Sequence, residues 1–498
     1  MAGAVSCTES QQRYLYLFVF IFLIGLWACY AYYFNPPIFP LDDGFIVLHN
    51  AQVLHLGYDR NYLGVPALAG ATSPIHLLIY YFLLFFLAPL WTMVTASWLA
   101  IIIYSFGLLR LAFIFRASLL QALLFCSSGL IIGLMPYQLL NGVETGWSLA
   151  VITWVLCLSV QPTQCIARAI LCGLLPFFHP ELFILTALLF VYYGWQYWQR
   201  DHKFNLVLKY LALDALWIAL AAAPWVIWYW LSLGEPFPST LLAKHAYFAQ
   251  NHMPFLFKWD IFTQVFVTFM ILLGYFNFLM MLFLLFVTPL GRVCLVFIAS
   301  FFLIYLMTDP SALSVNAQRY IYVIVPILLY GLISCIHHPQ KVVRWLANGI
   351  LVFSVIFSSW QLLPRWHFYV VDAQTMTQKL TRIVAWSLHN LPPRATILVH
   401  DAGYMAYATP FHLVDLVGLK TPSNIRYHQQ YTVPSMGRNR PEAVAAIISN
   451  THPQYLIDLP VWEHDFGITQ HLDRYGWHLQ LIHSDGNGYQ VYRITNSK

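Results

Sequence analysis

Two adjacent carboxylates, Asp42 and Asp43, open an apolar stretch in a loop near the amino terminus (residues 40–50, PLDDGFIVLHN). An aspartate ahead of a helix accepts an unpaired backbone N–H, and such a cap accounts for one of the two acids. Neighbouring side chains point about 100° apart on a helix, so the pair serves two different partners. One carboxylate can act as a general base on a reacting hydroxyl while the other binds a metal ion or orients the first.

Two glutamates stand at further boundaries between apolar runs. Glu144 lies in residues 141–146 (NGVETG), and Glu181 lies in residues 178–182 (FHPEL), beside His179. An acid at a membrane boundary is costly unless it is paired or functional, although a helix amino terminus stabilises one cheaply. Each position is therefore open to a structural and to a functional interpretation.

Cationic side chains occur at two positions that are expected to lie on the same face of the membrane. Lys244 and His245 follow a proline-rich entry (residues 234–245), and Arg319 precedes another apolar run. A lone lysine here can simply extend along the membrane surface, whereas an anionic lipid headgroup would bring such donors together. Acids for proton transfer and cations for a phosphate indicate transfer from a phosphate-activated donor, which in a membrane is a lipid phosphate.

The composition places most of the chain in lipid. Of 498 residues, 60% are hydrophobic and only 9% are charged, whereas a water-soluble protein is about a quarter charged. We predict a polytopic α-helical membrane protein with about 11 transmembrane helices, each needing roughly 20 apolar residues. The predicted spans are 14–33, 93–114, 118–137, 146–160, 166–179, 181–199, 209–231, 261–288, 293–308, 320–336 and 345–363.

Basic residues between these spans fall mainly on one side. That side carries Arg13, Arg110, Arg116, Arg168, Arg200, Lys203, Arg292, Lys341 and Arg344, and the other carries Arg60, Lys244, Lys258 and Arg319. The positive-inside rule makes the first side cytoplasmic, so the amino terminus lies inside and the carboxyl-terminal part outside. Residues 75–91 are also apolar, and a span there would invert everything after it. We predict a re-entrant or interfacial helix instead.

The character of the chain changes after Trp360. Short apolar strands are expected at 397–399, 412–416, 455–459 and 490–493, with a helix at 441–449 between them. This alternation predicts a small α/β domain. All eight cysteines precede Trp360, so no disulfide holds that domain together. We divide the chain into a membrane domain, 1–363, with an outer loop at 34–92, and a soluble domain, 364–498.

Short motifs in this order resemble the GT-C glycosyltransferases, which use polyprenyl-phosphate sugars, and among them the arabinofuranosyltransferases of arabinan synthesis and their bacterial relatives. The matching segments are 42–48 (DDGFIVL), 142–145 (GVET), 179–182 (HPEL), 238–244 (PSTLLAK) and Gln318-Arg319. They run through the whole predicted membrane part. His179 stands where the family usually has arginine, and segments 401–404 and 415–419 resemble the bacterial relatives, so the sugar is not carried over.

The resemblance implies roles for these residues. Asp42 would be the general base for the acceptor hydroxyl, and Asp43 would orient it or bind a divalent cation (Mg, Mn or Ca). Lys244, His245 and Arg319 would hold the donor phosphate, and three residues would line the sugar pocket, namely Glu144, His179 and Glu181. The partners would be a polyprenyl-phosphate-linked sugar, a glycan or glycolipid acceptor and the lipid bilayer, without nucleic acid. The place would be the outer face of a bacterial inner membrane.

Two other classes of function compete with this interpretation. A transporter or lipid flippase explains the spans and boundary charges without chemistry, but the sequence has no two related halves of the kind many transporters show. A sensor or assembly factor leaves the Asp42-Asp43 pair and the Lys244-His245 loop without a role. The sequence leaves open the sugar, the acceptor, the stereochemical outcome, metal dependence and the oligomeric state.

Overall fold

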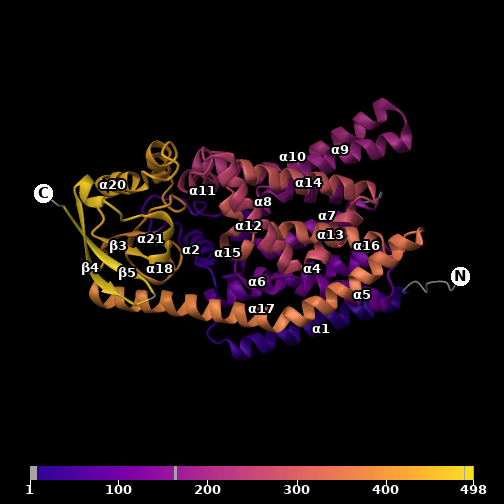
Figure 1. Ribbon diagram of the computed structural model, residues 1–498, viewed down its shortest axis with the longest axis horizontal. Helices are drawn as coiled ribbons and strands as arrows, with labels where there is room; N and C mark the ends of the chain where they lie inside the picture. The colour runs from indigo at the N-terminus through magenta and orange to yellow at the C-terminus, as the bar shows by residue number, and fades with distance from the viewer. Residues whose placement is uncertain (1–7, 162–164, 487, 497–498) are drawn as a thin grey trace.

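The computed structural model describes residues 8–161, 165–486 and 488–496, which form a helical bundle followed by a domain built on a small sheet (Figure 1). The bundle and its connections comprise α1 (Glu9–Tyr33), α2 (Asp43–Leu56), α3 (Pro74–Leu83), α4 (Pro89–Ile114), α5 (Leu119–Ile131), α6 (Met135–Leu140), α7 (Thr145–Ser159), α8 (Cys165–Phe178), α9 (Leu182–Asp201), α10 (Phe204–Leu233), α11 (Ser239–Phe248), α12 (Phe255–Leu273), α13 (Tyr275–Leu285), α14 (Pro289–Met307), η1 (Pro310–Ser314), α15 (Val315–Gln318), η2 (Ile321–Ile324), α16 (Val325–Ser334) and α17 (Lys341–Asn390).

Fewer helices than expected are long and apolar enough to cross a membrane. Within the described residues there are six, namely α1, α4, α10, α12, α14 and α17, and a seventh if the pair Pro310–Gln318 and Ile321–Ser334, bent by 86°, counts as one span. The structure therefore does not confirm 11 spans. Fewer spans result because some apolar runs contain a backbone break without any polar residue. At Gly133 and Gly274 a positive φ angle ends one helix before the next begins.

Residues 75–91 form only one short helix before α4. Ser73 caps α3, because its hydroxyl accepts the backbone N–H of His76, and Pro74 occupies the first turn. The helix has 10 residues, which gives a length of about 15 Å, half of the roughly 30 Å hydrocarbon core. It is too short to cross the membrane alone.

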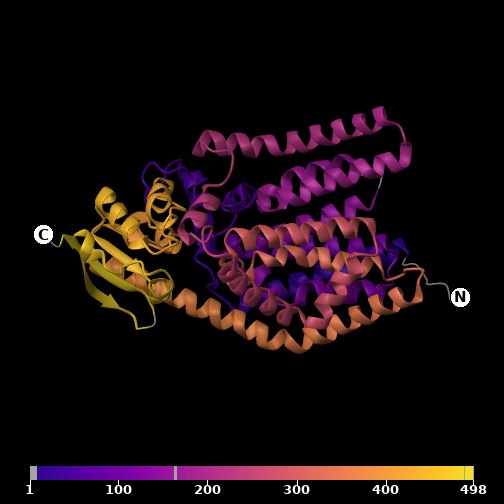
Figure 2. The same cartoon turned by 45° about the horizontal axis from the view of Figure 1, so that its top comes forward.

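The bundle has interior and peripheral helices. In the most apolar stretch of α4, 67% of the residues are buried, because α4 packs between α5 and α7, whereas the figure for α10 is only 11%. Together with α9, α10 forms an arm along one edge of the bundle (Figure 2). Apolar residues exposed on such an arm are stable only if lipid surrounds them.

The carboxyl-terminal domain contains a five-stranded mixed sheet in the order β2-β1-β3-β5-β4. The strands β1 (Thr396–Val399), β2 (His412–Asp415) and β3 (Tyr455–Asp458) are parallel, and β5 (Gln490–Asn496) runs antiparallel to both β3 and β4 (Trp477–Ser484). Its helical segments are α18 (Tyr404–Ala408), η3 (Pro422–Asn424), α19 (Ile425–Tyr427), η4 (His428–Thr432), α20 (Arg440–Thr451), α21 (Pro460–Phe466) and η5 (Leu472–Tyr475). This confirms a small sheet in the region where the sequence predicts an α/β domain.

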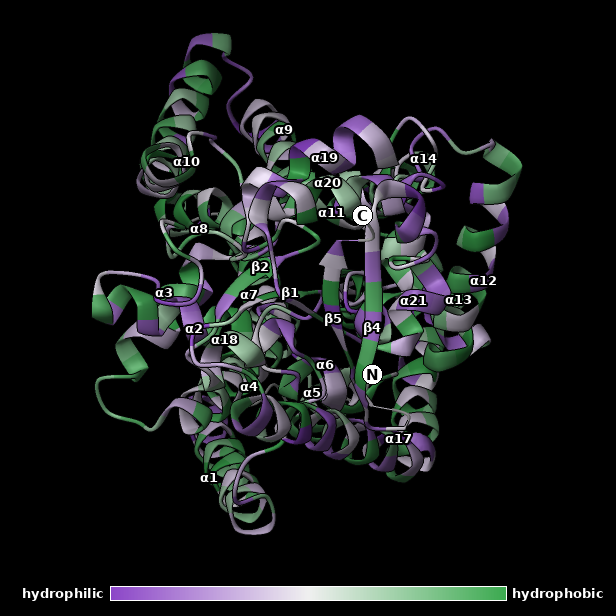
Figure 3. Ribbon diagram, turned by 90° about the vertical axis from the view of Figure 1, so that its left-hand side faces the viewer, coloured by the Kyte–Doolittle hydropathy of each residue, from purple (hydrophilic) through white to green (hydrophobic). Residues whose placement is uncertain are grey.

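The sheet is held by its own apolar core. Leu398 of β1 lies opposite Val414 and Leu456 in the register of the parallel strands, and both α20 residues Val444 and Ile448 pack into the same cluster. Seen from the end of the molecule that carries the terminal domain, the loops of this domain contain many hydrophilic residues, while peripheral helices such as α1 and α10 are largely hydrophobic (Figure 3).

One helix joins the two parts. The 50 residues of α17 continue from the bundle to the sheet without interruption, over about 75 Å, and the predicted domain boundary at 363/364 falls inside this helix, at Pro364 (Figure 1).

The outer loop fastens the terminal domain to the bundle a second time. The Lys420 ammonium donates to Asn50 Oδ1 at 2.6 Å and to Asp59 Oδ2 at 3.1 Å, and Lys420, Asn50 and Asp59 are all buried. Beside them, the Asn61 amide donates to the carbonyls of Thr409 and Phe411. A buried charge is tolerated only when it is paired and hydrogen-bonded, so the buried Lys420 ties the terminal domain to the outer loop.

Candidate active site

A cavity of about 780 Å³ lies where the bundle meets the terminal domain. Asp42, Asp43 and Lys244 line it from the bundle side, and Asp401 and Trp462 line it from the terminal domain. The volume is within the range of small-molecule sites. The parallel strands β1 and β3 direct their carboxyl ends towards this cavity, an arrangement in which α/β sheets commonly bind ligands.

Asp42 immediately precedes α2, but its side chain makes no capping bond to that helix. Instead, the backbone N–H groups of Gly403 and Tyr404 each donate to one of its carboxylate oxygens, at 2.7 Å. The side chain is only 7% exposed. Burial and the nearby Asp401 carboxylate outweigh these two donors and raise the pKa of Asp42 to about 8.

Asp43 has a different partner. Its Oδ2 lies 3.0 Å from Arg319 Nη1, and the Asn316 amide donates to the same oxygen at 3.2 Å. Burial opposes ionisation, but the charges of Arg319 and Lys244 prevail and hold the pKa of Asp43 below its ordinary value. The ionised form of Asp43 is therefore favoured, whereas Asp42 can exchange a proton near neutral pH.

Lys244 of α11 and Arg319, which follows α15, are brought together by one phenol. The Lys244 ammonium donates to the Tyr320 hydroxyl at 2.8 Å, and Arg319 Nη2 donates to the same oxygen at 3.0 Å. Three consecutive residues before Arg319, 316–318, have positive φ angles of 53–63° although none is glycine. Such strain persists only where the surroundings impose it, and it often marks functional sites.

The two predicted glutamates lie on the bundle side of this cation pair. Glu144 is buried, and its Oε1 has no hydrogen-bond partner among the described residues. It lines a small hollow together with Asp43, Lys244 and Arg319. Because a buried carboxylate oxygen without a donor is costly, this hollow is suited to a ligand that brings a hydroxyl.

Glu181 is connected to the same pair through aromatic side chains. Its Oε2 lies against His179 Nδ1, and the Tyr305 hydroxyl donates to its other oxygen. The ring of His179 in turn contacts the edge of the Tyr320 ring, with 5.4 Å between centroids. The segment of residues 178–182 therefore supports the residue that holds Lys244 and Arg319.

His245 is the predicted phosphate ligand that lies apart. Its Nδ1 is 2.7 Å from Asp309 Oδ2, and this hydrogen bond raises the pKa of the imidazole. The described residues that line the large cavity include Lys244 but not His245. Adjacent residues on a helix point in different directions, so Lys244 and His245 contact different partners, Tyr320 and Asp309.

The surroundings of Asp43 fit a cation poorly. In the described part of the chain, no group of three or more His, Cys, Asp or Glu side chains is placed to hold a metal ion. The nearest charged partner of Asp43 is a guanidinium rather than a second carboxylate, whereas Mg²⁺ and Ca²⁺ require several oxygen ligands. We therefore assign no step of the chemistry to a divalent cation.

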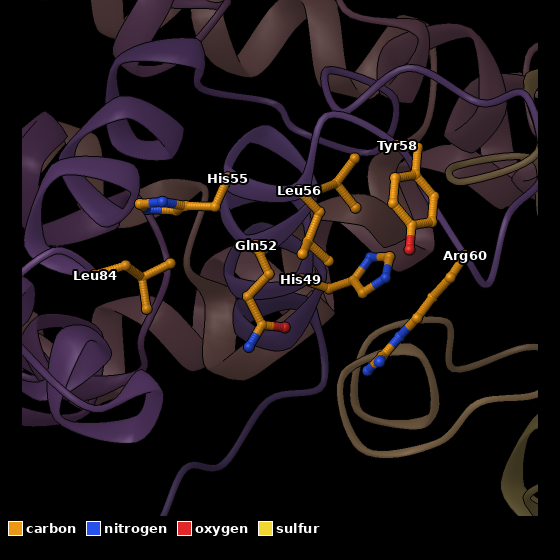
Figure 4. Close-up of a pocket in the computed structure, with 8 residues that line it drawn as sticks. His49, Gln52, His55, Leu56, Tyr58, Arg60 and Leu84 are labelled. Carbon is orange, nitrogen blue, oxygen red and sulfur yellow. The ribbon is translucent and has the colours of Figure 1, made fainter.

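A second pocket, of about 340 Å³, lies beside the outer loop and holds none of the predicted site residues. Tyr58 and Arg60 are at one end and His55 and Leu84 at the other, with His49 between them (Figure 4). His49 also contacts Asp59 and Asn61, so this pocket borders the interface with the terminal domain.

Several residues of the site were not predicted from the sequence. Gly403 and Tyr404 bind Asp42 through backbone atoms, which any residue possesses, so side-chain chemistry gave no indication of them. Asp401 and Trp462 belong to a domain whose docking could not be foreseen. Tyr320 stands directly after Arg319, and its position beside a predicted cation was the only available signal.

Comparison with known proteins agrees with this architecture. The structure of ArnT from Cupriavidus metallidurans bound to undecaprenyl phosphate aligns with a TM-score of 0.55 and 12% sequence identity, covering 95% of this chain and 97% of that chain. The chain has the fold of ArnT. The apo form of the same protein aligns with a TM-score of 0.51 at 12% identity, covering 91% and 93% of the two chains. With its apolar helices, this fold makes the chain a multi-pass membrane protein.

Sequence comparison adds little. Residues 368–492 match the family described as "Domain of unknown function (DUF8728)", which covers the terminal domain and the second half of α17. No curated protein matches the chain.

Proposed function

We propose that this chain is a GT-C glycosyltransferase that moves a sugar from a polyprenyl-phosphate donor to a hydroxyl of a cell-envelope glycan or glycolipid, at the outer face of a bacterial inner membrane. The observation that carries the proposal is that Asp42, a carboxylate able to accept a proton, lines the large cavity together with Lys244, whose ammonium shares the Tyr320 hydroxyl with the buried Arg319. The fold of ArnT, whose structure contains undecaprenyl phosphate, supports a lipid of this kind.

The cation pair would hold the donor. Two positive groups that share one neutral phenol retain unused N–H donors, and charge-assisted hydrogen bonds from them to a phosphate are short and strong. As the bond between the anomeric carbon and the phosphate oxygen breaks, negative charge grows on that oxygen. Lys244 and Arg319 stabilise this charge without reorganising, since Asp43 and Tyr320 already fix their positions.

Asp42 would accept the proton. The acceptor hydroxyl oxygen attacks the anomeric carbon, its proton passes to Asp42, and polyprenyl phosphate leaves. A general base works best when its pKa is near the working pH, and the pKa of Asp42 is raised to about 8, whereas that of Asp43 is lowered. Glu144 would bind a sugar hydroxyl through its unpaired oxygen, and the His179–Glu181 pair would support that pocket.

The test is transfer by purified protein in liposomes supplied with radiolabelled polyprenyl-phosphate sugars and a membrane glycolipid extract. Asp42→Asn should lose roughly a hundredfold or more, the usual scale for a positioned base. Lys244→Ala should weaken donor use, because it removes a bond worth about 1.5–3 kcal/mol, and Lys244→Arg should retain more activity. The exposed residues Asp260 and Lys341 provide matched controls, as Asp260→Asn and Lys341→Ala.

A transporter or flippase makes the opposite prediction. It would move the labelled lipid across the liposome membrane without releasing polyprenyl phosphate, and Asp42→Asn would leave that movement intact. Full transfer by Asp42→Asn would remove the base from the mechanism.

A further inference from the structure

A groove of about 460 Å³ opens on the bundle surface where two helices are irregular side by side. Between α12 and α13 the chain breaks at Gly274, with a φ of 82°, and the facing helix α17 contains Pro364. Both irregularities loosen the backbone hydrogen bonding at one level. The walls of the groove are mostly apolar and include Tyr275, Phe357 and Phe368.

Arg365 lines this groove, and only part of its guanidinium is hydrogen-bonded. The residue is 7% exposed, its Nη2 donates to the Leu272 carbonyl near the end of α12, and its Nη1 has no partner among the described residues. No carboxylate forms a salt bridge with it in the described part of the chain. An arginine buried in an apolar wall without a counter-ion points to an anionic ligand.

The position along α17 indicates what kind of anion reaches Arg365. The helix rises about 1.5 Å per residue, so Arg365 lies about 36 Å beyond Lys341, at the start of the same helix. The hydrocarbon core is about 30 Å thick, which puts Arg365 at the level of the outer lipid headgroups. The neighbouring Trp360 is 72% exposed, as tryptophans at the membrane interface commonly are.

The groove also leads towards the candidate active site. It shares Leu272 and Phe368 with an adjoining groove of about 520 Å³, and that second groove shares Ser314, Ala317 and Phe368 with the large cavity. Shared lining residues therefore connect the groove at Arg365 to the cavity that Lys244 and Asp43 line.

We propose that this groove is a second binding site for a polyprenyl monophosphate, with the phosphate on Arg365 and the isoprenoid chain along the apolar wall. The connection to the cavity favours the lipid whose head the cavity receives. This choice of lipid rests on the proposed function. The site itself rests on Arg365, and the alternative is that Arg365 only binds the end of α12.

Native mass spectrometry of the purified full chain with undecaprenyl phosphate tests the proposal. The parent protein should bind two lipids, and the Arg365→Gln variant should bind one. The affinity of the variant for lipid in the groove should be at least about tenfold weaker than that of the parent. Glutamine can still donate to the Leu272 carbonyl, so the end of α12 stays bound. The exposed Arg292, at the start of α14, provides the control Arg292→Gln, which should bind two.

Each arm decides a separate claim. Two lipids on Arg365→Gln would overturn the site, and so would phosphatidylglycerol that displaces the lipid from the parent at equal concentration. Lys244→Ala reports on the active-site cavity alone. If it binds both lipids as tightly as the parent while Arg365→Gln loses one, the proposed role of Lys244 in holding the donor phosphate fails and the groove stands.

Discussion

Replacing Gly403 with alanine should separate Asp42 from the terminal domain. Gly403 has φ −88° and ψ −68°, which alanine adopts readily, so backbone strain plays no part. The added Cβ would stand 2.3 Å from the Asp42 carbonyl oxygen and 2.9 Å from Asp42 Oδ2. Real Cβ atoms keep at least 3.0 Å, so the loop must retreat by about 0.7 Å from a backbone atom that cannot rotate away.

That retreat acts on two short hydrogen bonds. The N–H groups of residues 403 and 404 lie 2.7 Å from the carboxylate, and bonds to a charged group are worth about 1.5–3 kcal/mol each, so their loss would cost up to about 3–6 kcal/mol. The base would also be misplaced by a large fraction of 1 Å, an error that costs on the order of a hundredfold in rate. We therefore expect a marked loss of transfer and a lower melting temperature in Gly403→Ala.

Hydrogen exchange measured by mass spectrometry supplies the direct readout. The peptide that contains residues 403 and 404 should exchange faster in the variant, because both amides lose their acceptor. Gly349 provides the control, since its Cβ would meet nothing within 4 Å. If Gly403→Ala keeps the exchange protection and transfer rate of Gly349→Ala, Gly403 does not hold Asp42, and the reasoning is wrong.

Two further predictions concern the neighbours of the reacting groups. The kcat/KM for transfer should increase with pH up to about 8, because the base is the ionised form of Asp42. Asp401→Asn should move the midpoint of this pH profile to lower pH, because it removes a negative charge that raises the pKa of Asp42. A midpoint that stayed in place would contradict this. Tyr320→Phe keeps the ring but removes the shared hydroxyl, and it should raise the donor KM roughly 10–150-fold, since a hydrogen bond to a charged group contributes about 1.5–3 kcal/mol. An unchanged KM would mean that Lys244 and Arg319 do not depend on Tyr320.

Residue types and their spacing predicted part of the site. Asp43, Lys244 and Arg319 were each assigned to the outer side from the charge of the loops, and the structure brings all three to one small hollow. The direct pairing of Asp43 with Arg319 could not be predicted, because it joins positions 276 residues apart through tertiary packing. The separation of His245 from the cavity could not be predicted for a similar reason, since its partner Asp309 precedes η1, a distant segment of the sequence.

Some secondary-structure elements were likewise predicted from the sequence, and others were not. Three of the four expected strands start within one residue of β1, β2 and β3, and the fourth falls at the start of β5, because short apolar runs mark buried strands. The strand β4 was missed because the expected strands were sought as short apolar runs, whereas WHLQLIHS alternates apolar and polar residues, as a half-exposed edge strand does. Hydropathy also merged α12 with α13, since an apolar run does not reveal a glycine that ends a helix inside it.

The attachment of Asp42 to Gly403 has a consequence for the order in which the protein matures. The carboxylate leaves the ribosome 361 residues before the amide that holds it, and the interface partner Lys420 follows later still. While the membrane helices insert, the cavity has only one wall, and Asp42 has neither its donors nor the neighbour that tunes its pKa. Under the proposed mechanism, a product truncated before Gly403 would keep the membrane bundle but lack the two amides that hold Asp42, and we expect it to be inactive.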